Sequence, residues 1–353
     1  MNYKELLDEL IKIIIKEGGS DLHLSVGYNP AIRVNGELFF LQKINVLKTE
    51  DVFGIIDELL DEEYKSKFVK NKEVDFSYGT EEIRFRGNCF YSQGTPGVSL
   101  RLISKKIKTL QELNLPPILE DFTKKEQGFF LVVGPVGNGK TTTLAAMLDI
   151  INQNKSDHIV TIEDPIEYVF SKGKSVIDQR EVETDTKDFA SALKSVFRQD
   201  ADVLMIGEMR GLETITTSVT AAETGHLVLS TLHTNDAAQT IDRIIDVFPA
   251  GQQTQIRTQL AGSLLGIFSQ RLIPRISGGV IPAYELLIKN TAVANLIREA
   301  RTYEIPNVIE TGTKEGMISL DKSLSDLVRV GEITLEDAKR YSLQTDRLDR
   351  MLS

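Results

Sequence analysis

The chain has 353 residues, which predicts two or three domains at roughly 100–200 residues per domain. Its 41% hydrophobic and 26% charged residues are typical of a globular protein and exclude disorder, collagen and a disulfide scaffold. The single Cys89 excludes a four-cysteine zinc module, and a net charge of −10 without a Lys/Arg block disfavours a nucleic-acid-binding tail.

The N-terminus and the apolar runs indicate how the chain relates to membranes. Glu and Asp stand between the apolar residues of MNYKELLDELIKIIIKEGG, so this segment is not expected to be a signal peptide. Apolar runs such as Ile13–Ile15 and Phe129–Val133 are too short to cross a bilayer. We therefore expect a cytosolic protein that reaches any membrane or nucleic acid by docking.

The first domain is predicted to be α+β. Its expected elements are an amphipathic helix over Tyr3–Lys16, strands in Ser20–Phe40 around an Asn35-Gly36 turn, a helix over Lys48–Val69, and strands in Val74–Ile103. This domain is expected to span 1–104. A linker with a short helix follows over 105–117 and ends at Pro116-Pro117.

From Ile118 the pattern changes to short apolar strands that alternate with helical stretches. The expected strands are FFLVVG, HIVTIED, DVLMIGE and HLVLST, an alternation typical of a mostly parallel sheet covered by helices. Beyond Thr291 the pattern is helical. The second domain is therefore expected to be α/β over 118–353, with C-terminal helices from about 291.

A phosphate-binding loop follows the first of these strands. GPVGNGKT fits G-x-x-x-x-G-K-[ST] between an apolar strand and a helix, the context that the motif requires. Glycines allow the backbone N–H groups to approach phosphate oxygens, Lys140 reaches the β- and γ-phosphates, and Thr141 offers its hydroxyl to Mg²⁺. The candidate nucleotide-binding residues are Gly134, Pro135, Val136, Gly137, Asn138, Gly139, Lys140, Thr141 and Thr142.

Acidic residues end two further strands. VTIEDPIEY carries Glu163, Asp164 and Glu167, and ADVLMIGEMR delivers Glu208. Ligands of open α/β sheets lie at the carboxyl ends of strands, where a carboxylate can hold Mg²⁺ or the attacking water. Glu208 is a candidate for both tasks and Asp164 for the metal, while the separate roles of Glu163 and Glu167 stay open.

Two histidines flank the strand in GHLVLSTLHTND. We expect His226 and His233 near the same sheet edge, where a histidine close to the γ-phosphate would sense it or couple hydrolysis to motion. A structural role for each is the alternative. Zinc is not expected, because the chain offers neither cysteine ligands nor a His-x-x-x-His pair.

These motifs resemble, in the same order, those of the secretion-type hexameric ATPases, and most closely the type IV pilus retraction ATPases (PilT-like). The similar segments include SDLHLSVGYNPAIRVNGEL, RFRGNCF, GPVGNGKTTTLA, VTIEDPIEY, DADVLMIGEMR, GHLVLSTLHTNDA, SQRLIP and GMISLDKSLSDLV. The resemblance implies a PAS-like first domain and a RecA-like second domain. It also implies ATP and Mg²⁺ as cofactors, a homohexamer, pilus retraction and twitching motility, and docking at the inner face of the cytoplasmic membrane on a pilus platform protein that acts on pilin.

The resemblance also gives arginines of the first domain a role. Arg84, Arg86 and Arg101 match positions that face the nucleotide, where a guanidinium compensates the charge of the transferred phosphoryl group. A solvated strand face is the alternative. Two departures from the family pattern are Ala294, where the family often has Arg, and Gly211, where an acidic residue is common.

Three other functions remain as alternatives. A pilus assembly (PilB-like) or type II secretion ATPase usually has an extra N-terminal domain and a four-cysteine zinc element, and one cysteine disfavours it. A RecA-like nucleic-acid translocase would favour a basic channel. A non-catalytic ring subunit disagrees with intact Lys140, Thr141 and Glu208.

Overall fold

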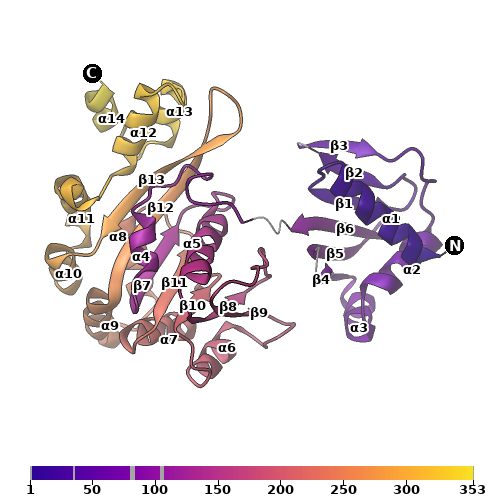
Figure 1. The fold of residues 1–353 in the computed structure, drawn as a ribbon, viewed down its shortest axis with the longest axis horizontal. Coiled ribbons are helices and arrows are strands. Elements are labelled where there is room, and N and C mark those ends of the chain that lie inside the picture. Colours follow the sequence, from indigo (N-terminus) through magenta and orange to yellow (C-terminus); the bar gives the residue numbers. More distant parts are fainter. Residues whose placement is uncertain (1, 35, 80–83, 104–106, 353) are drawn as a thin grey trace. The chain divides into compact units, whose positions relative to one another are not determined.

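The computed structural model describes residues 2–34, 36–79, 84–103 and 107–352 (Figure 1). The chain divides into two compact units, Met1–Lys106 with Glu167–Val169, and Ile107–Ile166 with Phe170–Ser353. Each unit has a hydrophobic core of its own. Asn35 of the predicted hairpin turn, and residues 104–106 at the predicted linker, lie outside the described residues.

The first unit is an antiparallel sheet with helices packed on it. The six strands follow the order β3-β2-β1-β6-β5-β4, and each neighbouring pair is antiparallel. The elements are α1 (Tyr3–Lys16), β1 (Asp21–Ser25), β2 (Ala31–Val34), β3 (Glu37–Phe40), α2 (Thr49–Leu59), α3 (Glu62–Asn71), β4 (Glu73–Gly79), β5 (Arg84–Ser92) and β6 (Thr95–Ile103).

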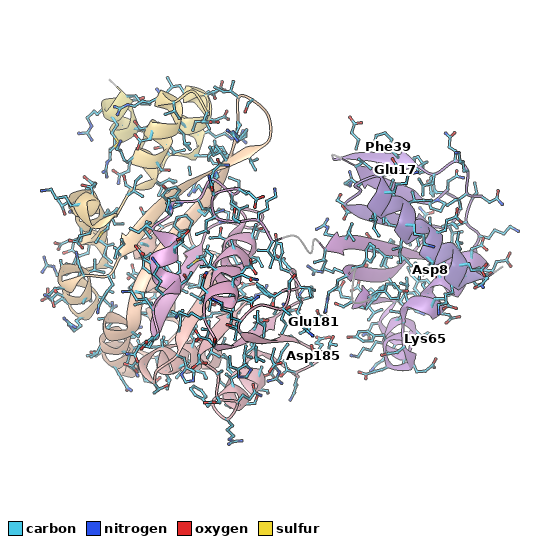
Figure 2. The ribbon with its side chains drawn as sticks, in the orientation of Figure 1. Asp8, Glu17, Phe39, Lys65, Glu181 and Asp185 are labelled. Atoms are coloured by element: carbon cyan, nitrogen blue, oxygen red, sulfur yellow. The ribbon has the colours of Figure 1, made fainter. Side chains whose placement is uncertain are left out.

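Strand alternation decides which face of this sheet is buried. Leu22 and Leu24 on β1 are fully buried in one core with Leu7, Leu10 and Ile14 of α1. The residues between them on each strand face away from this core. At one end of the sheet, the edge strand β3 is exposed along its length, and Figure 2 shows Phe39 on it.

The single helix predicted over Lys48–Val69 is wrong, because the structure has two helices there. Leu60 is extended, with φ −108° and ψ 136°, and ends α2. The Asp61 side chain then accepts a hydrogen bond of 2.9 Å from the N–H of Tyr64, which caps the start of α3. An N-cap signal inside a helical pattern thus marks a second helix.

The second unit is built on a seven-stranded sheet of order β13-β12-β7-β11-β10-β8-β9. Neighbouring strands are parallel except β12 and β13. The strands are β7 (Gly128–Val133), β8 (His158–Glu163), β9 (Val176–Glu181), β10 (Val203–Ile206), β11 (Leu227–Leu232), β12 (Leu264–Pro274) and β13 (Val280–Ile288).

Helices cover both faces of this sheet. Phe129 and Leu131 of β7 belong to one core with residues of α6 to α11, while Phe130 and Val132 belong to another with α4 and α5. The helices are α4 (Leu119–Thr123), α5 (Lys140–Asn154), α6 (Phe189–Val196), α7 (Leu212–Glu223), α8 (Ala237–Asp246), α9 (Ala250–Ser263), α10 (Thr291–Arg298), α11 (Ile305–Thr311), α12 (Leu320–Arg329), α13 (Leu335–Tyr341) and α14 (Thr345–Leu352).

The structure therefore confirms the mixed α/β class, the mostly parallel sheet and the helical pattern beyond Thr291. It adds β9, β12 and β13, which the sequence did not predict. The described part of the predicted linker, 107–117, has turns in place of the expected short helix. Within it, Leu110 and Leu115 are buried in the core of the second unit. Across the described residues, every helix is too short or too polar to span a membrane.

Candidate active site

The phosphate-binding loop joins β7 to α5. β7 is buried along its whole length, and α5 begins at Lys140. Gly134, Gly137 and Gly139 all have positive φ, of 144°, 77° and 76°. A Cβ on Gly134 would stand 2.3 Å from the carbonyl oxygen of Gln270, so both backbone conformation and space require glycine there.

Gln270 on β12 holds this loop in place through two side-chain hydrogen bonds. Its Nε2 donates to the carbonyl of Asn138 over 2.8 Å, and its Oε1 accepts from the Thr143 hydroxyl over 2.7 Å. The Asn138 Oδ1 in turn accepts from the N–H of Leu272 over 2.8 Å. The sequence did not predict a role for Gln270, which stands between Ser269 and Arg271 in a strand of mixed polarity.

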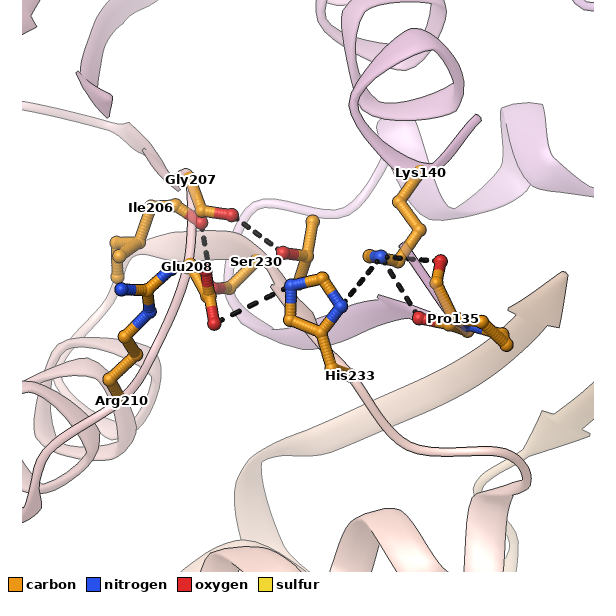
Figure 3. Close-up of polar contacts among 10 residues, drawn as sticks. Pro135, Lys140, Ile206, Gly207, Glu208, Arg210, Ser230 and His233 are labelled. Carbon is orange, nitrogen blue, oxygen red and sulfur yellow. Dashed lines mark hydrogen bonds and ion pairs between the residues drawn. The ribbon is translucent and has the colours of Figure 1, made fainter. Parts of the chain in front are cut away.

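Lys140 is buried and points back into its own loop. Its ammonium donates to the carbonyls of Gly134 and Pro135 over 2.9 and 3.0 Å, and it lies 3.2 Å from Nδ1 of His233 (Figure 3). An ammonium group donates hydrogen bonds and accepts none. The Nδ1 of His233 must therefore accept, which assigns the proton of the neutral ring to Nε2.

Glu208 lies on the other side of His233. Its Oε1 is 3.5 Å from His233 Nε2, and its Oε2 accepts from Arg210 Nη2 over 2.8 Å (Figure 3). Partial burial opposes ionisation of this carboxyl, but the hydrogen bond and charge of Arg210, with His233, outweigh it and lower the pKa of Glu208. Glu208 is thus a carboxylate at neutral pH.

The backbone around Glu208 is held by neighbouring strands. The N–H of Gly207 donates to the carbonyl of Ile162 over 2.8 Å, and Thr231 Oγ1 donates to the Gly207 carbonyl over 2.6 Å. Ser230 Oγ donates to the carbonyl of Ile206 over 2.8 Å (Figure 3). These contacts fix the end of β10 against β8 and β11, and they hold the backbone of Glu208 in place next to His233.

Lys140, His233 and Glu208 therefore meet at the carboxyl ends of parallel strands. A cleft of about 550 Å³ opens beside Glu208 and His233, and Arg210, Asn235 and Arg243 also line it. The sequence prediction that these residues converge at one sheet edge is borne out by their contacts. Such an edge is the usual ligand site of an open α/β sheet.

The acidic residues after β8 have different surroundings. Glu163 is buried, and its Oε1 accepts from the Thr161 hydroxyl over 2.6 Å and from Gln179 Nε2 over 3.2 Å. Asp164 and Glu167 are exposed. Glu163 ends a strand adjacent to β10, which ends next to Glu208, whereas Glu167 is grouped with the first unit.

The expectation that His226 and His233 share a sheet edge is wrong. The six buried residues of β11 separate them, and the N–H of Gly128, at the start of β7, donates to the carbonyl of His226. Because β11 and β7 are parallel, His226 lies at the amino edge of the sheet. Its Nδ1 is 3.1 Å from the Ala221 carbonyl, and its ring meets Phe197 edge-on. These are contacts of a structural residue.

The three predicted arginines lie on two strands of the first unit. Arg84 and Arg86 are on β5, and Arg86 is directly opposite Arg101 on β6. Arg86 and Arg101 are exposed. The Nε of Arg101 donates to Asp21 over 2.8 Å, which is the contact that orients it.

The site also fits a metal ion that would be bound together with the phosphates of a nucleotide. Among the described residues there is no group of three or more His, Cys, Asp or Glu side chains that could hold a metal by themselves. Mg²⁺ typically takes one or two protein oxygens together with substrate phosphates and water. The hydroxyl of Thr141, at the start of α5, and the ionised Glu208 supply oxygens of that kind.

Comparison with known proteins places this geometry in context. Residues 2–280 match the family model described as "Type II/IV secretion system protein". The chain is 44% identical to the type IV pilus retractation ATPase PilT of Pseudomonas aeruginosa, over 94% of this chain and 97% of that protein. It is 43% identical to a twitching motility protein of Neisseria gonorrhoeae, over 90% and 86%. A crystal structure of the pilus retraction motor PilT with bound ADP superposes with a TM-score of 0.92 and 45% identity, over 97% of this chain and 98% of that one.

Proposed function

Because the chain belongs to the type II/IV secretion system protein family, we propose that it is an ATP-hydrolysing motor that powers retraction of a type IV pilus. One observation carries the proposal: the phosphate loop, its lysine and the Glu208 carboxylate meet through His233, in a chain 44% identical to a retraction ATPase along nearly its whole length.

The chain's own residues supply the parts that phosphoryl transfer requires. The loop glycines and the N-terminus of α5 offer backbone N–H groups to the β- and γ-phosphates. Lys140 exchanges the carbonyls of Gly134 and Pro135 for phosphate oxygens when nucleotide binds. Glu208, ionised and half-buried, orients the attacking water and accepts its proton.

Magnesium belongs to the same proposal. Thr141 and Glu208 are the residues that would hold it, and Asp164, exposed at the end of β8, is a further candidate. When bound, Mg²⁺ neutralises charge on the β- and γ-phosphate oxygens. Burial and hydrogen bonds favour a structural role for Glu163, and the role of Glu167 stays open.

The finer architecture rests on the family resemblance and on each unit's topology. The antiparallel sheet with helices on its buried face supports a PAS-like first domain, and the parallel sheet behind the phosphate loop supports a RecA-like second domain. We infer a homohexamer whose Arg84, Arg86 and Arg101 compensate phosphate charge. A platform protein of the inner membrane would transmit the stroke to pilin, with the ring docked on its cytoplasmic side.

Two substitutions test the ATPase. Lys140→Ala abolishes turnover, because no other side chain of the loop carries a positive charge. Glu208→Gln keeps nucleotide binding but slows hydrolysis at least about a hundredfold, the range for loss of one positioning or electrostatic group. Phosphate release and nucleotide titration measure both. Unchanged turnover in Lys140→Ala contradicts the ATPase, and a Glu208→Gln protein that binds no nucleotide contradicts the hydrolytic role.

A deletion in the source organism tests the direction of the motor. Loss of retraction gives surplus surface pili without twitching, whereas loss of assembly gives no pili. Complementation with Lys140→Ala should reproduce the deletion, which separates loss of the motor from loss of the protein. Absence of pili in the deletion strain would assign the chain to assembly.

A further inference from the structure

The sheet of the first unit carries a row of charged residues on the face opposite its core. Strand register places Arg33 of β2 opposite Asp21 of β1, Asp21 opposite Arg101 of β6, and Arg101 opposite Arg86 of β5. Directly opposed residues of antiparallel strands have their side chains on the same face. The row therefore contains one acid among three arginines.

Asp21 is the buried member of this row. Asp21 is only 6% exposed, although it lies on the face of the sheet that carries charged side chains. Its Oδ1 accepts from Arg101 Nε over 2.8 Å, and its Oδ2 accepts from the Ser20 hydroxyl over 2.8 Å. Burial opposes ionisation, but these hydrogen bonds and the charge of Arg101 lower the pKa of Asp21. A carboxylate that is ionised at neutral pH therefore contacts the guanidinium.

The Arg101 side chain is largely exposed, but its Nε is held by a hydrogen bond. Its side chain is 70% exposed, and Asp21 engages its Nε. The planar guanidinium has five donors in a rigid fork, so a bond through Nε orients the donors of Nη1 and Nη2 as well. An exposed arginine without such a bond would sample many rotamers, and ordering it would cost free energy each time it bound a ligand.

We propose that Asp21 is the positioning residue of Arg101, holding its guanidinium ready for the terminal phosphate of the nucleotide. The inference rests on the proposed function, in which Arg101 compensates phosphate charge. Asp21 touches no substrate in this scheme and acts through Arg101 alone. A surface ion pair that merely stabilises the fold would contribute little to stability and would not affect the choice between nucleotides.

The test is a double-mutant cycle in the full-length protein. The variants are Asp21→Ala, Asp21→Asn, Arg101→Ala and Asp21→Ala with Arg101→Ala, with Asp75→Asn as the control. Asp75 is an exposed carboxylate on the same face, bonded to Asn88 over 2.9 Å, so it reports the effect of removing one negative charge. The readouts are kcat, KM, and affinity for ADP and for a non-hydrolysable ATP analogue.

We expect Asp21→Ala and Arg101→Ala each to lower kcat at least about tenfold, a small part of the roughly 10³–10⁵ that a phosphate-compensating arginine supplies. The double variant should be no slower than Arg101→Ala, because each substitution removes the same interaction. Affinity for the ATP analogue should fall and affinity for ADP should not. Asp21→Asn, which keeps the acceptor oxygen, should lie between parent and Asp21→Ala.

Three results overturn the inference. If Arg101→Ala is slow but Asp21→Ala turns over at the parent rate, the link between the two residues is refuted and the proposed function stays intact. The same conclusion holds if the losses in kcat multiply in the double variant. Arg101→Ala at the parent rate, with normal assembly, would refute the role of Arg101 itself. If Asp21→Ala fails to fold, Asp21→Asn against Asp75→Asn decides the question with the same nucleotide readout.

Discussion

His233 is the residue at which the two parts of the candidate active site meet. Its ring stands between the ammonium of Lys140 and the carboxylate of Glu208, at 3.2 and 3.5 Å. Because the lysine only donates, the ring presents its Nε2 proton to Glu208. In the proposed function, a phosphate that draws Lys140 away would change the hydrogen bonding of this ring, which would link nucleotide binding to Glu208.

Gln270 gives a prediction at the same scale. Gln270→Met keeps the volume of the side chain but removes the donor to Asn138 and the acceptor from Thr143. Leaving these buried polar partners unsatisfied destabilises the conformation of the phosphate loop by roughly 1–3 kcal/mol. Since ADP binds to that conformation, its affinity should fall about tenfold or more. Calorimetric titration with ADP measures the change. Gln252→Met, at an exposed position of α9, is the control, and equal affinity in the two variants would contradict the role.

The residues whose place at the sheet edge was predicted correctly share a local signal. Lys140, Glu208 and His233 each stand in a short pattern of glycines or an apolar strand that ends in a polar side chain. Gln270 has no such signal, because its role depends on β12 pairing with β7 from a distant part of the sequence. His226 was misplaced for a related reason: proximity to a strand does not say which end of a parallel sheet a residue occupies.

At the scale of elements, helix α10 carries one of the two departures that the family resemblance identifies. Ala294 stands where the family often has Arg, and the structure buries it beside Val293 and Ile297 in the main core of the second unit. The neighbouring Ala292 is exposed. Two alanines of one short helix, two residues apart, therefore have opposite surroundings: Ala294 is buried and Ala292 is exposed to solvent.

This arrangement predicts that restoring the family residue is destabilising here. Ala294→Arg must place a long charged side chain into a packed core, which we expect to lower the free energy of unfolding by about 1–3 kcal/mol. Ala292→Arg, on the exposed side, should change it by less than about 0.5 kcal/mol. Urea unfolding followed by circular dichroism compares them, and equal stability would show that α10 accommodates the arginine.

Sequence patterns predicted the elements whose period is simple. The helices α1 and α5 and the apolar strands β7, β8, β10 and β11 follow from spacing alone. The break at Leu60 was missed because the apolar spacing continues through it, and only the cap at Asp61 marks the boundary. Strands β12 and β13 mix polar and apolar residues, and their pairing is fixed by the sheet rather than by their own pattern.

A buried carboxyl between β13 and the start of α8 gives a pH prediction. Glu285 on β13 accepts from the N–H of Ala237 at the start of α8 over 2.9 Å. Burial, first of all, and the charges of Asp236, the residue that caps α8, and of Asp321 on α12 raise its pKa from 4.5 to about 7, against the opposing effects of the Ala237 hydrogen bond and of Arg271 on β12. The folded protein therefore holds a proton here that the unfolded chain releases.

The sign of the effect follows from that difference. Between about pH 4.5 and 7 the unfolded chain binds fewer protons at this position, so Glu285 makes stability fall as pH rises. Glu285→Gln keeps the acceptor oxygen and cannot ionise. The variant should gain stability relative to the parent across this window and match it more closely below it. Thermal unfolding at several pH values measures the difference; a constant difference across the window would contradict a titrating Glu285.

At the scale of the whole molecule, the proposed function divides its residues between two separately packed units. The phosphate loop, His233 and Glu208 belong to the second unit, whereas Arg86, Arg101 and Asp21 belong to the first. Each unit has its own core, so each can respond to a ligand on its own.

Hydrogen exchange in the full chain measures how each unit responds to nucleotide. ADP should protect backbone amides of the phosphate loop and the start of α5 in the second unit, because binding to the folded form raises its stability by mass action. A non-hydrolysable ATP analogue should in addition protect amides of β5 and β6 around Arg86 and Arg101, because its γ-phosphate offers the charge that the arginines compensate. Lys140→Ala should lose both effects, and Arg101→Ala should lose the second while keeping the first. Equal protection of β5 and β6 by ADP and by the ATP analogue would mean that the first unit does not distinguish the γ-phosphate, and the stroke would then need another trigger.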